Sequence, residues 1–153
     1  MLLSLERADF TDPDLHEFLQ AHLDDLAPTA PAESRHALDL SGLRRPGVRL
    51  WVATDGGSIV GTGALAAVEP GHEELKSMRT APQRRGQGIA TRILEHLLAD
   101  ARSRGVRRIS LETGSMEFFA PARALYAKAG FVPCAPFGSY RDDPNSTFLT
   151  MPL

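Results

Sequence analysis

The sequence lacks the features that mark several large classes of protein. Only one of its 153 residues is cysteine, Cys134, so a disulfide framework and a cysteine-based zinc site within one chain are excluded. No apolar run approaches the ~18 residues that a membrane-spanning helix needs. The N-terminus reaches Glu6 and Arg7 without a basic region or a long apolar one, which argues against a signal peptide. We therefore expect a cytoplasmic protein with no membrane partner.

The charge is nearly balanced and the histidines are scattered. A net charge of -2 argues against a nucleic-acid partner, because domains that bind nucleic acid are usually strongly basic. With 42% hydrophobic residues, the chain is also too apolar to be mainly disordered. No pair of histidines has the spacing of metal ligands backed by a third ligand, so no metal site is expected. The length predicts a single domain over residues 1–153.

The hydrophobic pattern alternates between strand-like and helix-like segments. Strands are expected over residues 3–7, 48–54, 59–68, 74–80, 108–112, 131–134 and 147–151, and helices over about 13–26, 33–40, 89–104 and 118–129. In the strand at 74–80, simple alternation places Leu75 and Ser77 opposite Lys76 and Met78. The hairpins favour antiparallel pairing, and the strand–helix–strand units of the second half favour a parallel pair. The sequence therefore predicts an α/β (α+β mixed) fold with a mixed sheet of about seven strands and helices on both faces.

The most informative segment is a glycine-containing loop that leads directly into the most regular helix. Gly86 and Gly88 let backbone N–H groups approach a ligand closely, and the N-terminus of the following helix favours a phosphate. Arg84 and Arg85 add full positive charges beside it. The spacing matches neither a P-loop nor a dinucleotide fingerprint. A phosphate-binding loop for another ligand is the main reading, and a plain turn is the alternative.

Two motifs in this half of the chain resemble those of one enzyme family. The run Gln83-x-x-Gly86-x-Gly88-x-Ala90 resembles the acetyl-CoA motif of the GNAT (GCN5-related) N-acetyltransferase superfamily, and Ala122-x-x-Leu125-Tyr126-x-x-x-Gly130-Phe131 resembles its second signature. The order of elements is similar to the GNAT fold, whose mixed sheet is mostly antiparallel. Segments 76–79, 111–114 and 140–146 resemble a bacterial, small-molecule-type subgroup. Many members have asparagine where this sequence has Phe119.

The resemblance implies acetyl-CoA (coenzyme A) as co-substrate and no metal. Its pyrophosphate would lie on the backbone of residues 84–90, and its pantetheine arm would run beside residues 78–80 like an extra strand, because a strand edge offers unpaired N–H and C=O groups. The residues expected to contact it are Met78, Arg79, Thr80, Gln83, Arg84, Arg85, Gly86, Gln87, Gly88, Ile89, Ala90, Phe119 and Ala122.

The resemblance also suggests which residues take part in acetyl transfer. Tyr126 is the expected acid that protonates the leaving thiolate, although a tyrosine in a helix more often packs in the core. The base is left between Glu74 and Glu112, each of which is otherwise an exposed charge at a strand end. A backbone N–H near Met78 or Arg79 would stabilise the oxyanion. His72 as the base and Cys134 as a nucleophile are less favoured.

The acceptor is expected to be the primary amine of a small polar molecule, attacked directly in a ternary complex. Its site would lie between the first helical pair and the loop before the last strand, whose polar residues are His22, Asp24, Asp25, Tyr140, Arg141, Asp142 and Asp143. A protein N-terminus or lysine is the second choice of acceptor. A non-catalytic acyl-CoA-binding sensor and a nucleotide-binding regulator are the rival classes, and the resemblance allows a homodimer.

Overall fold

A computed structural model describes residues 1–32 and 36–153. The strands are β1 (Leu3–Arg7), β2 (Val48–Asp55), β3 (Ser58–Glu69), β4 (His72–Thr80), β5 (Arg108–Gly114), β6 (Val132–Pro133) and β7 (Ser146–Pro152). The helices are α1 (Pro13–Leu26), α2 (Leu40–Leu43), α3 (Ile89–Ser103) and α4 (Ala120–Ala129), with short 3-10 turns at Ala27–Thr29, Pro82–Arg84 and Glu117–Phe119.

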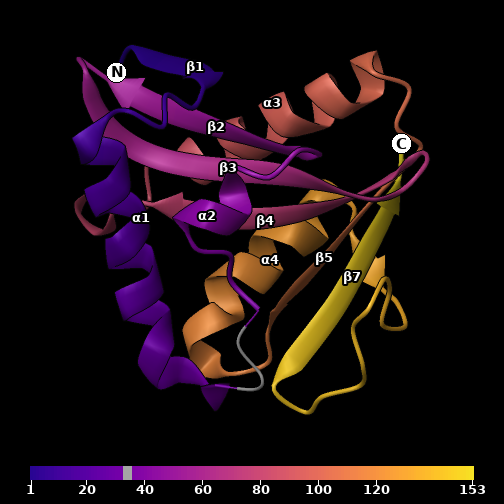
Figure 1. Cartoon of the computed structure of the whole chain (residues 1–153). Coiled ribbons are helices and arrows are strands. Elements are labelled where there is room, and N and C mark those ends of the chain that lie inside the picture. Colours follow the sequence, from indigo (N-terminus) through magenta and orange to yellow (C-terminus); the bar gives the residue numbers. More distant parts are fainter. Residues whose placement is uncertain (33–35) are drawn as a thin grey trace.

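All the strands join one sheet, in the order β1-β2-β3-β4-β5-β7-β6 (Figure 1). Every neighbouring pair is antiparallel except β4 with β5, which is parallel. The hairpin between β2 and β3 turns at Gly56 and Gly57, both with positive φ. The structure thus confirms the predicted mixed, mostly antiparallel sheet with one parallel pair.

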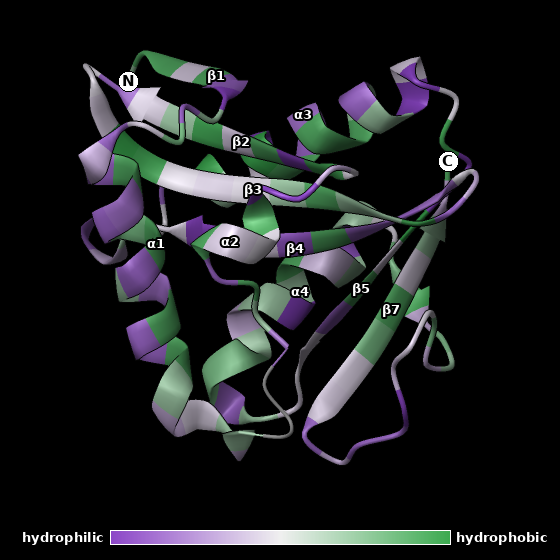
Figure 2. Ribbon diagram, viewed as in Figure 1, coloured by the Kyte–Doolittle hydropathy of each residue, from purple (hydrophilic) through white to green (hydrophobic). Residues whose placement is uncertain are grey.

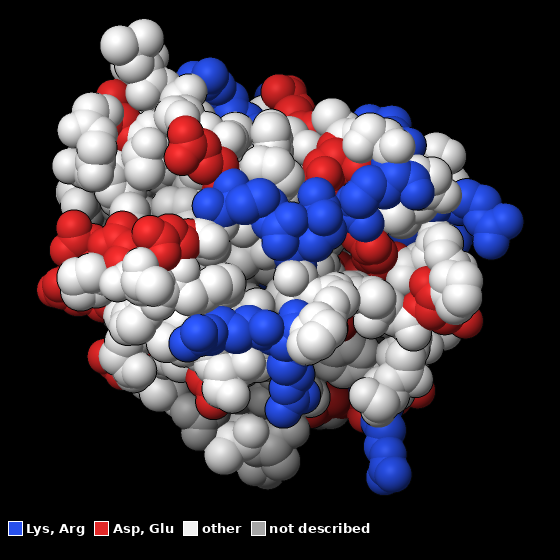
Figure 3. Space-filling view, turned by 45° about the horizontal axis from the view of Figure 1, so that its top comes forward, with Lys and Arg blue, Asp and Glu red and all other residues white. Residues whose placement is uncertain are grey.

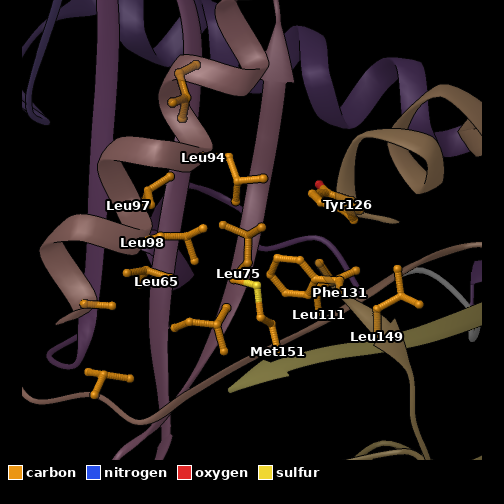
Figure 4. Close-up of a cluster of buried hydrophobic side chains, with 14 of the residues drawn as sticks. Leu65, Leu75, Leu94, Leu97, Leu98, Leu111, Tyr126, Phe131, Leu149 and Met151 are labelled. Carbon is orange, nitrogen blue, oxygen red and sulfur yellow. The ribbon is translucent and has the colours of Figure 1, made fainter. Parts of the chain in front are cut away.

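Helices cover both faces of this sheet, and each face has its own core. On one face α3 and α4 pack Ile93, Leu97 and their neighbours against Leu65 and Leu75 (Figure 4). On the other face α1 and α2 pack against Leu50 and Val52 of β2. Figure 2 shows the corresponding division of α1 into a hydrophobic side and a hydrophilic outer side. Burying each such large side chain contributes roughly 1.5–3 kcal/mol, so the α3 face is the main source of stability.

The second predicted helix lies elsewhere. The expected helix over 33–40 partly falls on residues 33–35, which lie outside the described residues, and residues 36–39 are not helical. The helix begins at Leu40, because the Asp39 side chain accepts a hydrogen bond from the Gly42 N–H (2.8 Å) and caps it. A capping aspartate marks a helix start rather than a helix interior.

Strand β4 contains a bulge that the sequence pattern did not reveal. Its register with β3 passes from Ala64↔Lys76 to Thr62↔Arg79, so β4 has one residue more than β3 over this stretch. The extra residue is Ser77, whose φ is 55°. Its carbonyl accepts a hydrogen bond from Thr62 Oγ1 (2.8 Å), which keeps the bulge tied to β3.

The bulge changes which side chains share a face of β4. Met78 packs with Leu75 on the α3 face, whereas Lys76 contacts the backbone carbonyl of His36 on the opposite face. Arg79 is also on that opposite face, beside α1. The predicted alternation, with Lys76 and Met78 together, is therefore wrong, because a bulge inserts one residue into a period of two.

Candidate active site

The sheet opens between its two parallel strands. β4 and β5 pair only from His72–Leu75 to Arg108–Leu111, while β4 continues to Thr80 and β5 to Gly114. Figure 1 shows the two strands diverging from the right of the view toward the left, with α4 behind the opening. Backbone groups on the facing edges of the two strands have no strand between them there, and two cavities lie along this opening.

The larger cavity, of about 550 Å³, lies beside the glycine loop and the start of α3. It is lined by His22, Asp25, Leu26, Met78, Arg79, Thr80, Arg84, Arg85, Gly86, Gly88, Ile89, Ala90, Thr91, Phe118, Phe119, Pro121, Ala122, Leu125 and Tyr126. Every residue predicted to contact the cofactor is in this set except Gln83 and Gln87. The residues predicted to contact the cofactor thus line one cavity, which extends from the glycine loop to β4.

The glycine loop offers its backbone to this cavity. Gly86 and Gly88 have φ of 76° and 77°, a conformation that other residues rarely adopt. A Cβ atom at either position would meet nothing within 4 Å, so the backbone conformation rather than crowding requires glycine. Gly88 is the N-cap of α3 and has no side chain to satisfy the first N–H groups, so these donors are left for a ligand.

The two arginines of the loop have different roles. Arg84 donates to Asp55 Oδ2 (2.6 Å) and to Gln87 Oε1 (3.0 Å), so its guanidinium ties the loop to the β2–β3 hairpin. This hydrogen bond lowers the pKa of Asp55, and the carboxylate in turn balances the charge of Arg84. Arg85 is exposed beside the cavity and is the arginine of the pair with a charge available to an anion.

The smaller cavity, of about 150 Å³, brings the three predicted catalytic residues together. It is lined by His22, Leu26, Thr29, Ala30, His36, Ala37, Glu74, Leu75, Lys76, Ser77, Met78, Glu112, Thr113, Gly114, Met116, Phe119, Ala122, Tyr126 and Asn145. Glu74 comes from β4, Glu112 from β5 and Tyr126 from α4. Glu74 is among the last paired residues of β4, and Glu112 directly follows the paired part of β5. Both carboxylates therefore line one space at the point where the strands begin to diverge.

Glu74 is held by two partners that sequence reasoning missed. Tyr140 donates its hydroxyl to Glu74 Oε2, and Lys76 Nζ lies 3.2 Å from the same oxygen. Lys76 also donates to the Tyr140 oxygen (3.0 Å) and to the His36 carbonyl (3.1 Å). Lys76 follows Glu74 by two residues on one strand, so this pair was open to prediction. Glu74 is thus held in place by the side chains of Lys76 and Tyr140.

Glu112 is in a different electrostatic position. Its only hydrogen-bond donor among the described residues is the Ser146 hydroxyl, 2.6 Å from Oε2. Burial raises the pKa of Glu112, and this outweighs the opposing effects of the Ser146 hydrogen bond, His36 and Lys76. A carboxylate with a raised pKa binds a proton more readily than an ordinary one. Of the two carboxylates, Glu112 is therefore the one better suited to accept a proton.

Tyr126 belongs to the core and also borders both cavities. It is 6% exposed and packs edge-on against Phe131, with 5.8 Å between ring centroids. Tyr126 belongs to α4, and Figure 4 shows it at the edge of the buried cluster. Burial raises its pKa well above the usual value for tyrosine, so the hydroxyl stays protonated at all working pH values. The core-packing role is real, and it does not exclude a role as a proton donor.

The two cavities share a set of lining residues where they meet. These are His22, Leu26, Met78, Phe119, Ala122 and Tyr126. Phe119, at the place where asparagine is common in the resembling family, packs closely against Gly114, where a Cβ atom would be 2.1 Å from its ring. It forms part of the wall at this junction.

The predicted acceptor residues are only partly at the site. His22 lines both cavities, and Asp25 lines the larger one, where it pairs with Arg79 Nη1 at 2.8 Å. Asp24 instead accepts a hydrogen bond from Gln20. The loop before β7 contributes Asn145 to the smaller cavity, whereas residues 141–143 line neither. No single residue of that loop carried a signal that separates Asn145 from its neighbours.

The remaining surface is of mixed charge. Figure 3, which turns the β1 and α3 end forward, shows a band of Lys and Arg beside Asp and Glu side chains. Arg49 pairs with Asp100 (2.9 Å) and Arg104 with Glu73 (2.7 Å).

Among the described residues no group of three or more His, Cys, Asp or Glu is placed to hold a metal ion. In the same part of the chain no helix has the length and apolar character to cross a membrane.

Comparisons of the sequence with known proteins point to one family. Residues 2–131 match the model of the acetyltransferase (GNAT) family. The chain is 43% identical over 145 residues to the N-acetyltransferase YsnE of Bacillus subtilis, covering 95% of this chain and 96% of that protein. It is 44% identical over 140 residues to the IAA acetyltransferase of Azospirillum brasilense, covering 91% of this chain and 88% of that protein.

Two solved structures have the same fold as this chain. An acyl-CoA N-acyltransferase of Klebsiella pneumoniae superposes with a TM-score of 0.82 and 33% identity, over 99% of this chain and 98% of the other. An acetyltransferase of Bacillus subtilis in complex with CoA shares the fold, with a TM-score of 0.71 at 16% identity, over 99% of each chain.

Proposed function

The chain belongs to the acetyltransferase (GNAT) family and is an acetyl-CoA-dependent N-acetyltransferase, and from this premise we propose that its acceptor is the primary amine of a small polar molecule, attacked directly in a ternary complex. The observation that carries the proposal is the meeting of two cavities at Tyr126 and Met78. One cavity suits a donor and the other an acceptor. Two substrates that enter from different sides and meet need no acetylated enzyme intermediate.

In this proposal the larger cavity holds acetyl-CoA. The pyrophosphate lies on the backbone of Gly86 to Ala90, where a helix N-terminus offers N–H donors. The pantetheine arm runs beside Met78 to Thr80, along the part of β4 that has no pairing with β5. The thioester then reaches the junction, next to Tyr126. Gln83 and Gln87 lie outside the cavity lining, and Gln87 supports the loop through Arg84.

The chemistry follows from the order of proton transfers. A primary amine enters mainly as an ammonium ion at neutral pH, and Glu112 removes a proton from it inside the smaller cavity. The free amine attacks the thioester carbonyl, while the Met78 N–H at the bulge stabilises the oxyanion. Tyr126 protonates the departing thiolate. Glu74, whose charge is balanced by Lys76, positions Lys76 and Tyr140 and takes no part in proton transfer.

The size of the smaller cavity favours a small acceptor. Its volume is about 150 Å³, and an apolar protein cavity of about this size holds one benzene molecule. A compact amine fits inside it, whereas a protein acceptor would insert only its first residue or one lysine side chain. A protein N-terminus or lysine therefore remains the second candidate, because the same junction would accept an amine at the end of a chain.

The test is a screen of amines with acetyl-CoA, with detection of the free thiol. We expect turnover with at least one compact polar amine, weaker turnover with larger amines, and little with lysine-containing peptides. IAA, which appears in the name of the Azospirillum brasilense relative, is tested separately from the amines. Preference for a peptide would overturn the small-molecule acceptor, and tight binding of acetyl-CoA without any turnover would favour a sensor. Thermal stabilisation by ATP or NAD instead of acetyl-CoA would contradict the assignment of the larger cavity.

A further inference from the structure

We propose that the His22 imidazole takes the proton that the attacking nitrogen releases after it has bonded to the acetyl carbon. This inference rests on the proposed function, since it concerns the same junction of donor and acceptor cavities. It assigns a catalytic role to α1, an element that the family motifs of the sequence do not include.

The position of His22 is the first reason. It is one of the few residues that line both cavities. Of the shared residues, only His22 and Tyr126 carry a side-chain N–H or O–H group. The reacting nitrogen must come from one cavity and the acetyl carbon from the other, so their bond forms at this junction. Tyr126 serves the departing sulfur, which leaves His22 as the side chain available to the nitrogen.

The state of the imidazole is the second reason. His22 is flanked by Arg79 of β4, which disfavours a positive charge on the ring, and by Asp25 of α1, which favours it. Burial and Arg79 together lower the pKa of His22 to about 4, so the ring is neutral at neutral pH. Among the described residues none forms a hydrogen bond with it, so its basic nitrogen is available to a substrate.

The reaction needs two separate proton acceptors. Deprotonation of the entering ammonium ion uses Glu112. Attack of the neutral amine then forms the N–C bond and moves the carbonyl π electrons to oxygen, which leaves the nitrogen positively charged. His22 takes one proton from that nitrogen, the C=O bond reforms, and the C–S bond breaks with its electron pair on sulfur.

The protons balance over one turnover. Tyr126 gives its proton to the thiolate and becomes a phenolate, while His22 becomes an imidazolium ion. Return of one proton from His22 to Tyr126, directly or through water, restores both groups. Glu112 releases to solvent the proton that it took from the entering ammonium ion. The products are therefore the acetylated amine, coenzyme A thiol and one proton, with no oxidant or reductant required.

The experiment compares His22→Ala and His22→Asn with the full-length wild-type chain, using an amine that the screen has shown to be acetylated. We expect kcat to fall about 100-fold or more in both variants, the usual range for a general base, with binding of acetyl-CoA unchanged. Added imidazole should restore much of the lost turnover in His22→Ala, because the truncated side chain leaves space for a free base. Glu17→Gln, on an exposed position of the same helix, is the control and should match the wild type.

Two results would overturn the inference. One is full turnover in both His22 variants. The other is a rise in acceptor KM with unchanged kcat and no effect of imidazole, which would make His22 a binding residue only. His22→Asn keeps much of the side-chain volume, so its melting temperature and circular dichroism separate a folding defect from a catalytic one. If the wild type acetylates no amine at all, it is the proposed function that fails, and this inference falls with it.

Discussion

The two cavities that meet at Tyr126 are built in different ways. The larger one, the backbone cavity, is lined mainly by one stretch of chain from Met78 through the glycine loop to Thr91, with α1 and α4 closing it. The smaller one depends on side-chain carboxylates, Glu74 and Glu112, which come from two strands and are held by residues from a third segment.

This difference indicates what each cavity has to recognise. A donor with a long invariant arm is bound by backbone N–H groups, whose position is fixed by the fold and which carry no titratable group. An acceptor whose amine must lose a proton needs side chains with adjusted pKa values, and burial between diverging strands provides them. We propose on this basis that the larger, backbone cavity serves binding of the donor and that the smaller, side-chain cavity serves proton transfer.

The largest expected effect lies at the meeting point of the cavities. Tyr126→Phe keeps the ring and its packing against Phe131 but removes the proton given to the thiolate. We expect kcat to fall about 10²–10⁴-fold, with normal folding and normal binding of acetyl-CoA by calorimetry. Equal losses of binding and turnover would point to positioning of the donor instead. Full activity would return Tyr126 to core packing alone.

The assignment of the backbone cavity to acetyl-CoA is tested by introducing a negative charge in the glycine loop. Gly88→Asp places a carboxylate where phosphate is proposed to lie, and we expect the Kd for acetyl-CoA to rise at least about 100-fold, since close like charges cost several kcal/mol. Gly88→Asn is the matched control, because Asn and Asp tolerate the positive φ equally well. If the two variants bind acetyl-CoA alike, strain rather than charge explains the loss, and the phosphate site is misplaced.

The role of the side-chain cavity in proton transfer is tested by the dependence of kcat on pH. Glu112→Gln should lower kcat by about tenfold to a hundredfold at mildly acidic pH, and less as pH rises, because more amine is then already neutral. Glu74→Gln should give a smaller loss that does not depend on pH. The opposite ranking in a pH–rate profile would make Glu74 the base.

The same substitution gives a stability readout. The folded-state pKa of Glu112 is raised, so its charged form opposes folding at pH values above that pKa and has no effect below the ordinary pKa. As pH rises through this window, the wild type loses stability that Glu112→Gln keeps. We expect the melting temperature of the variant to equal or exceed that of the wild type at neutral pH. A large drop would show that the carboxylate stabilises the fold.

The smallest effect is expected at the support of Glu74. Tyr140→Phe removes the hydroxyl that donates to the Glu74 carboxylate, and a hydrogen bond to a charged group contributes about 1.5–3 kcal/mol. We expect a loss toward the lower end of this range in chemical denaturation and only a few-fold loss of kcat, because Lys76 still neutralises Glu74. A loss of kcat as large as that of Tyr126→Phe would place Tyr140 in the chemistry.

The backbone cavity was more open to prediction than the side-chain cavity. Glycine positions and a helix start were enough to propose a phosphate-binding loop over residues 84–90, and the family resemblance extended the proposed site to residues 78–80. The partners of the carboxylates lie far apart in sequence: Tyr140 is 66 residues from Glu74, and Ser146 is 34 from Glu112. No periodicity connects such residues. The choice between the two carboxylates, left open by the sequence, therefore depended on the fold.

Two local errors have physical causes. The helix predicted over 33–40 ignored Asp39, whose side chain starts a helix instead of continuing one. The alternation predicted for β4 failed at Ser77, because bulges are usually anticipated from glycine and here a serine adopts the positive φ. The strands and the main helices follow from periodicity, which these local effects leave intact.

The bulge at Ser77 also changes the strand beside the cavities without changing which side chains pack in either core. Without Ser77, β4 would match β3 residue for residue, since Lys76 and Arg79 already pair with Ala64 and Thr62. Leu75 and Met78 would remain on the α3 face, and Lys76 and Arg79 on the other. A chain shortened by this one residue is thus expected to fold with both cores intact and with a straight strand beside the two cavities. In the proposed mechanism, the one added residue in β4 therefore serves the reaction and not the fold.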